Sequence, residues 1–176
     1  MDDKFANLLT TNPPNLEEIK SIMVEGIVDI NRVDKIGYTP LLCLIQMSKG
    51  DYLLEVISLL LEHGVDVNHK DKDGWNALYF LCHYHQQKDN LIEIIKLLIK
   101  NGIDVKWKPH NENNILHFYC KNYKGEHFID IVDIFLKNGV EMVSDGFDAR
   151  NLVNNPKYPP RKNVEQIIDL MDNIVL

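Results

Sequence analysis

The chain has 176 residues, of which 45% are hydrophobic, and it carries a formal net charge of −7 at pH 7. This length is sufficient to bury a core, so the sequence predicts one compact unit or a short array of repeats. Because 26 acidic residues outnumber 19 basic ones, the surface repels phosphate backbones, and general nucleic-acid binding is not expected.

The sequence shows no signal for a membrane or for secretion. Its longest apolar runs, such as LIEIIKLLI, are short and interrupted by charge, and residues 1–14 lack a basic segment followed by an apolar one. Cys43, Cys82 and Cys120 are an odd number of cysteines in a chain without an N-x-[ST] sequon, which argues against a disulfide framework. We therefore expect a cytoplasmic protein with reduced thiols, and leave the nucleus or a host-cell cytosol open.

The chain begins with two predicted helices, near 2–9 and 16–25, separated by a turn at Pro13 and Pro14. Three helix pairs follow. The first helix of each pair begins with Thr39 or an Asn, residue types that cap helix N-termini. These first helices are expected at 38–47, 75–84 and 113–122. The second helix of each pair has apolar residues at three-and-four spacing and stops at a Gly. These second helices are expected at 51–64, 90–102 and 127–139.

The helix pairs belong to a sequence repeat. Acidic residues at 29, 66, 104 and 141 follow one another by 37, 38 and 37 residues, and Gly64, Gly102 and Gly139 by 38 and 37. Self-similarity at a fixed period indicates a stacked array. The polar segments between pairs, rich in Asn, Asp and Gly, suit short turns.

The repeat resembles the ankyrin family. The segment 37–41 matches the family pattern G-x-T-P-L, 64–68 matches G-A-D-V-N, and His117 occupies the place of the His in T-P-L-H. The resemblance implies an all-α repeat fold, a solenoid of stacked helix pairs with β-turn fingers. The period exceeds the usual 33 residues because four or five residues are inserted between the two helices of each pair. These insertions, near Tyr84, His85, Tyr123 and His127, are either solvated loops or a second binding edge.

We interpret the chain as a single domain, 1–176, whose terminal units shield the ends of the stack. The expected units are an N-terminal cap (1–31), three repeats (32–68, 69–106 and 107–143) and a C-terminal cap (144–176). In the last of these, a short helix, a proline-containing loop and a final helix around 164–174 are expected.

No residue pattern in the chain predicts catalysis or a cofactor. The sequence has no Gly-rich phosphate loop, G-x-S-x-G or H-E-x-x-H, so we expect no enzyme. Cys82 with His83 and His85, or His117 with Cys120, are fragments of a metal site, whereas zinc requires four convergent ligands. We expect neither a metal nor a cofactor, and interpret the cysteines as core thiols.

The resemblance implies that the finger tips and the outward side of the first helices form a concave face that grips partners. We expect that face to include Lys35, Ile36, Tyr38, Met47, Lys72, Trp75, His83, Tyr84, Trp107, His110 and Asn113. Aromatic residues without a core role are frequent interface hot spots. The alternative is that Trp75 and Trp107 brace adjacent turns. A basic strip accompanies these residues and suits a partner segment with acidic and apolar residues. The basic strip consists of Lys35, Lys70, Lys72, Lys106 and Lys108.

The sequence therefore predicts a non-enzymatic, monomeric protein-interaction module that acts as an inhibitor, a decoy or an adaptor. A second hypothesis is that an aromatic and lysine clamp on the fingers, such as Trp75 beside Lys72, senses a small ligand or an oligonucleotide. Saturable binding of adenine oligonucleotides distinguishes the two hypotheses.

Overall fold

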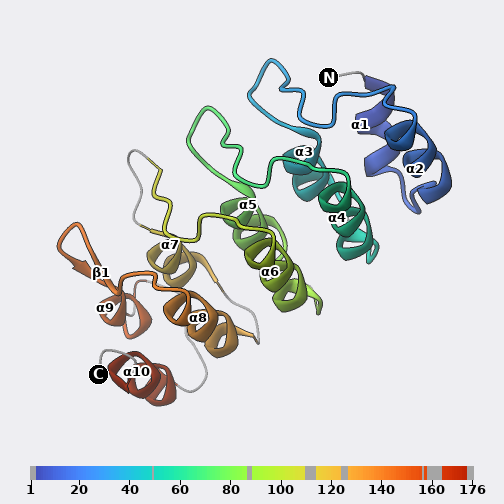
Figure 1. Ribbon diagram of the computed structural model, residues 1–176. Coiled ribbons are helices and arrows are strands. Elements are labelled where there is room, and N and C mark those ends of the chain that lie inside the picture. The colour runs from blue at the N-terminus through green and yellow to red at the C-terminus, as the bar shows by residue number, and fades with distance from the viewer. Residues whose placement is uncertain are drawn as a thin grey trace.

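Figure 1 shows the computed structural model of the chain, in which helix pairs stack side by side and long turns project to one side. The structure describes residues 3–48, 50–86, 89–109, 114–123, 127–155, 157 and 164–173. The helices of the first half are α1 (Asp3–Thr10), α2 (Leu16–Val24), α3 (Pro40–Met47), α4 (Leu53–Glu62) and α5 (Ala77–Tyr84). Those of the second half are α6 (Leu91–Lys100), α7 (Ile115–Asn122), α8 (Phe128–Lys137), α9 (Ala149–Val153) and α10 (Val164–Asn173).

The observed helices of the three pairs lie within the predicted segments and begin or end up to two residues inside their bounds, and local chemistry explains where they start and stop. Thr39 accepts a hydrogen bond from the Leu42 N–H, and the side chain of Asn76 caps α5 in the same way. Each second helix is followed by a glycine in the left-handed region, at φ 81° for Gly64 and 83° for Gly102. A side chain with a Cβ is strained in that conformation, so glycine ends the helix and turns the chain toward the next finger.

Stacking of the pairs builds one continuous apolar core. Within a unit α3 packs on α4 and α5 on α6, and between units α3 packs on α5 and α5 on α7. The first helices are buried over most of their length, as the run Ala77–Cys82 shows. The all-α repeat fold expected from the sequence is therefore confirmed. Among the described residues, no helix is both long and apolar enough to cross a membrane.

The three cysteines are free thiols buried in this core. Burial raises the pKa of the Cys43 thiol to about 11 and raises that of Cys82 as well. Because the thiolate is the nucleophile and the metal ligand, these thiols are inert at neutral pH. No group of three or more His, Cys, Asp or Glu side chains within the described ranges is placed to hold a metal ion.

The last finger differs from the turns expected elsewhere, because it forms a small β-hairpin. Strand β1 (Val143–Ser144) pairs antiparallel with β2 (Phe147–Asp148), and Asp145 and Gly146 connect them at φ 51° and 80°. Two residues with positive φ match the twist of paired strands, and Asp-Gly is a favoured sequence for such a turn. Arg150 then joins the hairpin to the last helix, since it contacts Asp148 and donates to Asp172 at 2.7 Å.

Candidate functional site

Aspartate side chains fix the shape of the first two fingers. Asp34 accepts the N–H groups of Ile36 at 3.0 Å and Tyr38 at 2.8 Å. Asp71 makes the same two bonds in the second finger, to the N–H of residue 73 at 3.0 Å and of Trp75 at 2.8 Å. Such turns are held by their own side chains. The two fingers therefore present their tips in equivalent positions, and Ile36 is 56% exposed at the first tip.

Ring nitrogens join each of these fingers to the following one. The His69 ring nitrogen Nε2 lies 2.8 Å from the Gly37 carbonyl oxygen, and Trp107 Nε1 donates to the Gly74 carbonyl at 2.7 Å. His69 and Trp107 are 38 residues apart, as the repeat requires. Sequence analysis missed this pairing, although the shared spacing of rings and glycines was the available signal. Trp107 consequently has a bracing role beside its predicted role in binding.

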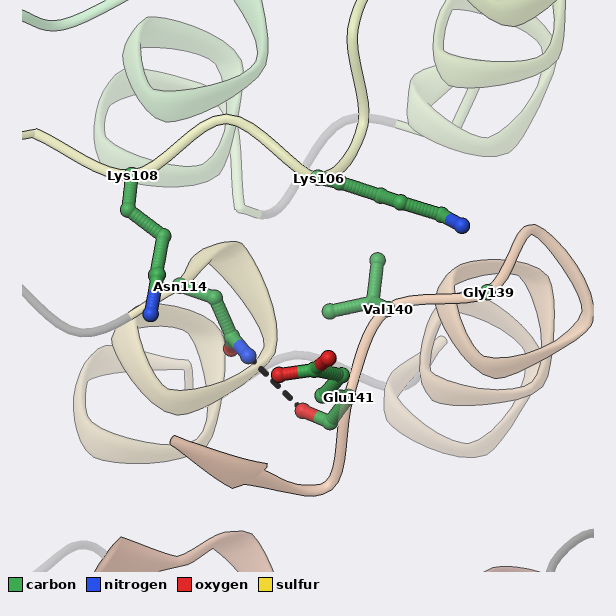
Figure 2. A pocket seen from close by; sticks show the side chains of 6 residues that line it. All are labelled: Lys106, Lys108, Asn114, Gly139, Val140 and Glu141. Atoms are coloured by element: carbon green, nitrogen blue, oxygen red, sulfur yellow. Dashed lines mark hydrogen bonds between the residues drawn. The ribbon is translucent and has the colours of Figure 1, made fainter. Parts of the chain in front are cut away.

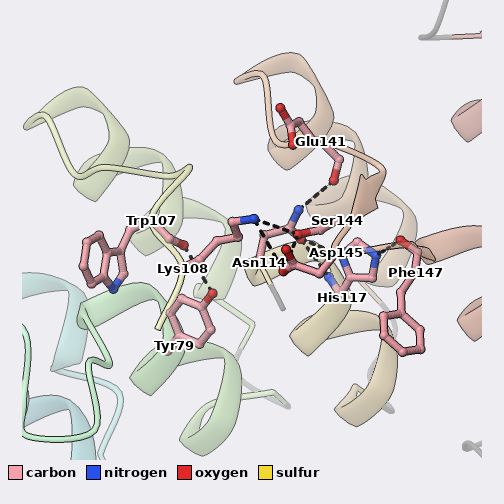
Figure 3. A network of polar contacts seen from close by, with 9 residues as sticks. All are labelled: Tyr79, Trp107, Lys108, Asn114, His117, Glu141, Ser144, Asp145 and Phe147. Carbon is pink, nitrogen blue, oxygen red and sulfur yellow. Dashed lines mark hydrogen bonds and ion pairs between the residues drawn. The ribbon is translucent and has the colours of Figure 1, made fainter. Parts of the chain in front are cut away.

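Further contacts hold Trp107 in place. Lys70 Nζ lies 3.9 Å from the centre of the indole ring, a cation–π contact, and the Tyr79 hydroxyl donates to the Trp107 carbonyl at 3.3 Å (Figure 3). The lysine and the tryptophan that pair on the fingers are therefore Lys70 and Trp107, and they contact each other directly. The clamp predicted from the sequence stays a prediction. Lys72, assigned to that clamp with Trp75, donates its ammonium group to the Lys35 carbonyl.

Trp75 is half-buried among other rings. Its ring centroid lies 6.1 Å from those of Tyr79 and Phe80, 5.4 Å from that of His83, and 5.1 Å from that of Phe118 in the next unit. Edge-to-face contacts of this kind stabilise packing beyond the burial of area. The contacts favour the bracing interpretation of Trp75, and its role in partner binding stays a prediction.

Two exposed large apolar side chains of the predicted site lie at the ends of α3 and α5. Met47 and Tyr84 are the last residues of these neighbouring helices, and they are 54% and 43% exposed. The Gln46 amide donates to the Tyr84 hydroxyl at 3.1 Å and to the Tyr38 hydroxyl at 3.4 Å, which links the two units. We call the set Tyr38, Met47, His83 and Tyr84 the concave patch. The structure thus links three of the predicted site residues through Gln46 and a ring contact, and Met47 follows Gln46 in the chain.

Other predicted residues are placed differently. Lys35 and Lys72 are exposed on the first two fingers, with the Lys72 ammonium group on the Lys35 carbonyl. His110 and Asn113 lie outside the described residues. Of the rings considered at the inserted edge, His85 and Tyr123 are buried, at 4% and 1% exposure, whereas His127 is partly buried and Tyr84 is exposed. A second binding edge there stays a prediction. His85 bonds through Nε2 to the Ile45 carbonyl of the preceding unit.

A buried histidine on α7, His117, connects this helix to the hairpin of the last finger. His117 Nε2 lies 2.8 Å from the Phe147 carbonyl oxygen, and Nδ1 lies 2.8 Å from Asn114 Oδ1 (Figure 3). The Asn114 orientation is fixed, since Oδ1 also accepts the His117 backbone N–H and Nδ2 donates to the Glu141 carbonyl. The structural role expected for His117 from the resemblance is consistent with these contacts.

We expect the stability of the array to fall as the pH is lowered from 7.5 to 5. Burial lowers the pKa of His117 from its usual 6.5, although the Phe147 carbonyl and the carboxylates of Asp148 and Asp145 oppose this shift. A depressed histidine pKa means that the unfolded chain binds the proton first, so stability is full above pH 6.5 and decreases below it. Urea unfolding across this range should show the decrease. A His117→Gln variant should show a flatter pH profile, and equal slopes for both proteins would contradict the assignment.

Comparison with known families agrees with this architecture. The family profile described as ankyrin repeats (3 copies) matches residues 8–108, which is more than half of the chain. No curated protein matches the chain. The matched segment contains the end of α1, helices α2 to α6 and the first two fingers, including the turns built on Asp34 and Asp71. On this match, the chain belongs to the ankyrin-repeat family.

Proposed function

We propose that the chain binds a partner protein through the concave patch and the adjoining finger tips. Ankyrin repeats are protein-interaction modules that are typically non-enzymatic, and the family match supports a protein-binding role. The location of the binding face is inferred from Met47 and Tyr84, which are exposed at equivalent positions of neighbouring first helices. Gln46 holds Tyr84 in place through a hydrogen bond to its hydroxyl. The Tyr84 ring is held and loses little conformational entropy on binding, and the flexible Met47 thioether can adapt to an apolar partner surface.

The charge around the patch favours a partner segment with both apolar and acidic residues. The protein carries a net charge of −7, yet the basic strip concentrates lysines on the fingers. Asp34 and Asp71 lie among these lysines, but their carboxylates accept backbone N–H groups inside the turns. Lys35 makes no ion pair with any residue that the structure describes. A segment with an acidic residue near the first finger and apolar residues over the patch is complementary to this surface.

A module of this kind acts by occupying or bridging its partner. A rigid array that covers a segment needed elsewhere is an inhibitor or decoy, whereas one that binds two partners is an adaptor. The stacked units supply the rigidity, because they share one apolar core and because ring-to-glycine hydrogen bonds join the first three fingers.

The test replaces exposed residues only, so that the fold is preserved. We expect the double variant Met47→Ser/Tyr84→Ser to weaken partner binding at least about tenfold, since loss of two central contacts commonly costs more than about 1.4 kcal/mol. The partner is captured from a lysate of the source cells and identified by mass spectrometry, and its affinity for the purified proteins is measured by calorimetry.

Val24→Ser/Ile27→Ser is the matched control. These two residues are also apolar and exposed, at 75% and 64%, but they lie at the far edge of the first unit. The control should bind like the wild type, and circular dichroism melts should agree for all three proteins. Equal binding by the Met47/Tyr84 variant, or loss in the control alone, would place the binding face elsewhere.

A further inference from the structure

At the first two joints between units, an asparagine side chain bridges to the backbone of the next unit. Asn31 Nδ2 donates to the Gly64 carbonyl at 3.1 Å, and its Oδ1 accepts the Asp66 N–H at 2.6 Å. Asn68, which is 37 residues later, makes the same pair of bonds to the following unit, at 2.9 and 2.7 Å. In each case a carboxamide group satisfies one backbone acceptor and one backbone donor.

The third joint has a lysine in the asparagine position. The Lys106 N–H donates to the Asp104 carboxylate at 3.0 Å, as the Asn68 N–H donates to Asp66 at 2.9 Å, so the chain follows the same path. The Lys106 side chain has no carbonyl oxygen and cannot make the bridge. Its end lies above Gly139, where Nζ is 2.9 Å from the place a Cβ would occupy.

The backbone around Gly139, which an asparagine bridge would reach, has the same conformation as the backbone around Gly102. The Gly139 N–H donates to the Leu136 carbonyl at 2.9 Å and the Val140 N–H to Phe135 at 3.1 Å, the bonds made by residues 102 and 103 one unit earlier. The φ angle of Gly139 is 78°, against 83° for Gly102. The Gly139 carbonyl and the N–H of residue 141 therefore stand in the positions that receive an asparagine elsewhere. Among the described residues, neither has a hydrogen-bond partner.

A cleft of about 290 Å³ lies at this joint (Figure 2). It is lined by Lys106, Lys108, Asn114, Gly139, Val140 and Glu141. Figure 2 shows the Lys106 side chain extended toward Gly139 and away from Asn114, with the Val140 side chain pointing up toward it. The Asn114 amide already donates to the Glu141 carbonyl at 2.7 Å.

The charges around the cleft balance without a ligand. Lys108 Nζ lies 3.5 Å from the Asp145 carboxylate and 3.1 Å from the Ser144 hydroxyl. The remaining ammonium group, that of Lys106, faces a surface that also carries the Glu141 carboxylate. A neutral ligand therefore fits better than an anion, because an anion would meet a carboxylate and a carbonyl oxygen.

We propose that this cleft binds a primary carboxamide, in the place that Asn31 and Asn68 fill at the first two joints. The ligand amide donates to the Gly139 carbonyl, and its oxygen accepts the Glu141 N–H and the Lys106 ammonium. The carboxamide would come from an Asn or Gln side chain of the bound partner segment, and this part of the proposal rests on the proposed function. The existence of the site does not depend on that function.

The closing experiment uses small probes on the full chain, so it is independent of any partner. Acetamide is titrated while the Glu141 amide signal is followed by ¹H–¹⁵N NMR, with acetate and N,N-dimethylacetamide as comparisons. We expect a saturable shift with acetamide that is reduced by at least half with dimethylacetamide, which has no N–H to donate, and with acetate at matched ionic strength. Equal shifts with all three probes, or a larger shift with acetate, would overturn the proposal.

The variant Lys106→Asn supplies the proposed ligand group, a primary carboxamide, from the chain itself. It should abolish the acetamide shift and raise the midpoint of thermal unfolding by about 2–4 °C, because two hydrogen bonds are added at the joint. The exposed Lys100→Gln removes the same charge away from the cleft and should retain the acetamide shift. A retained shift in Lys106→Asn, or no rise in its midpoint, would show that the backbone groups are not arranged as at the other joints.

Discussion

Replacing Trp75 with alanine is expected to lower the free energy of unfolding by about 3 kcal/mol, the lower end of the range for large aromatic residues, since Trp75 is only half-buried. The indole contacts Tyr79 and Phe80 in its own unit and Phe118 in the next. Its loss opens a gap that both units border, and stacked arrays depend on such interfaces between neighbours. Urea denaturation followed by circular dichroism measures the change.

Trp75→Phe is the matched variant, because it keeps a ring in the same place. We expect it to recover more than half of the lost stability. If Trp75→Ala unfolds at the wild-type urea concentration, the ring is not a brace and its predicted binding role gains support. If the expected loss is found, weaker partner binding by Trp75→Ala reports damage to the array and not the loss of a direct contact.

The second large effect is expected at Asn114. Its replacement by alanine should lower the free energy of unfolding by about 3 kcal/mol. This buried side chain caps α7 through the His117 N–H at 3.2 Å, contacts the His117 ring at 2.8 Å, and donates to the Glu141 carbonyl at 2.7 Å. Loss of an N-cap costs about 1 kcal/mol, and leaving buried partners unsatisfied costs about 1–3 kcal/mol more.

A serine at position 114 separates these contributions. Asn114→Ser retains an oxygen that can cap α7, so it should recover about 1 kcal/mol relative to Asn114→Ala. It cannot reach Glu141 as the longer amide does, so the remaining loss should persist. Equal stability of Asn114→Ala and the wild type in thermal and urea unfolding would contradict the assigned network.

The sequence was sufficient to predict the helix pairs because their signals are local. Thr39 and Asn76 mark helix starts and Gly64 marks a helix end through contacts within a few residues along the chain. Apolar residues at three-and-four spacing then determine which side of each helix is buried. The repeat period added the order of the units, since identical turns at fixed intervals stack in only one way.

The site was harder to predict because its contacts cross between units. His69 and Trp107 reach glycine carbonyls about 33 residues away in the chain, and Trp75 contacts Phe118 in the next unit. An aromatic residue in a turn has the same local pattern whether its ring faces solvent or the neighbouring finger. Met47 and Tyr84 were correctly placed on the exposed side of their helices because helical periodicity fixes that side. Trp75 and Trp107 lie in turns, where no helical periodicity applies. The sequence therefore left open whether they brace adjacent turns or bind a partner.

Lys106 stands where Asn31 and Asn68 stand at the first two joints, so the third joint between fingers is held by different contacts. The first two joints are held at finger level by uncharged amide bridges and by ring-to-glycine bonds, whose strength depends little on salt. The third joint keeps the Asn114 amide contact with Glu141 and adds the Lys108 ion pair with Asp145 and the contact of the His117 ring with the Phe147 carbonyl. Added salt screens the exposed Lys108 pair, which has no counterpart among the contacts named for the first two joints, so ionic strength acts most directly on the boundary that carries the last helices.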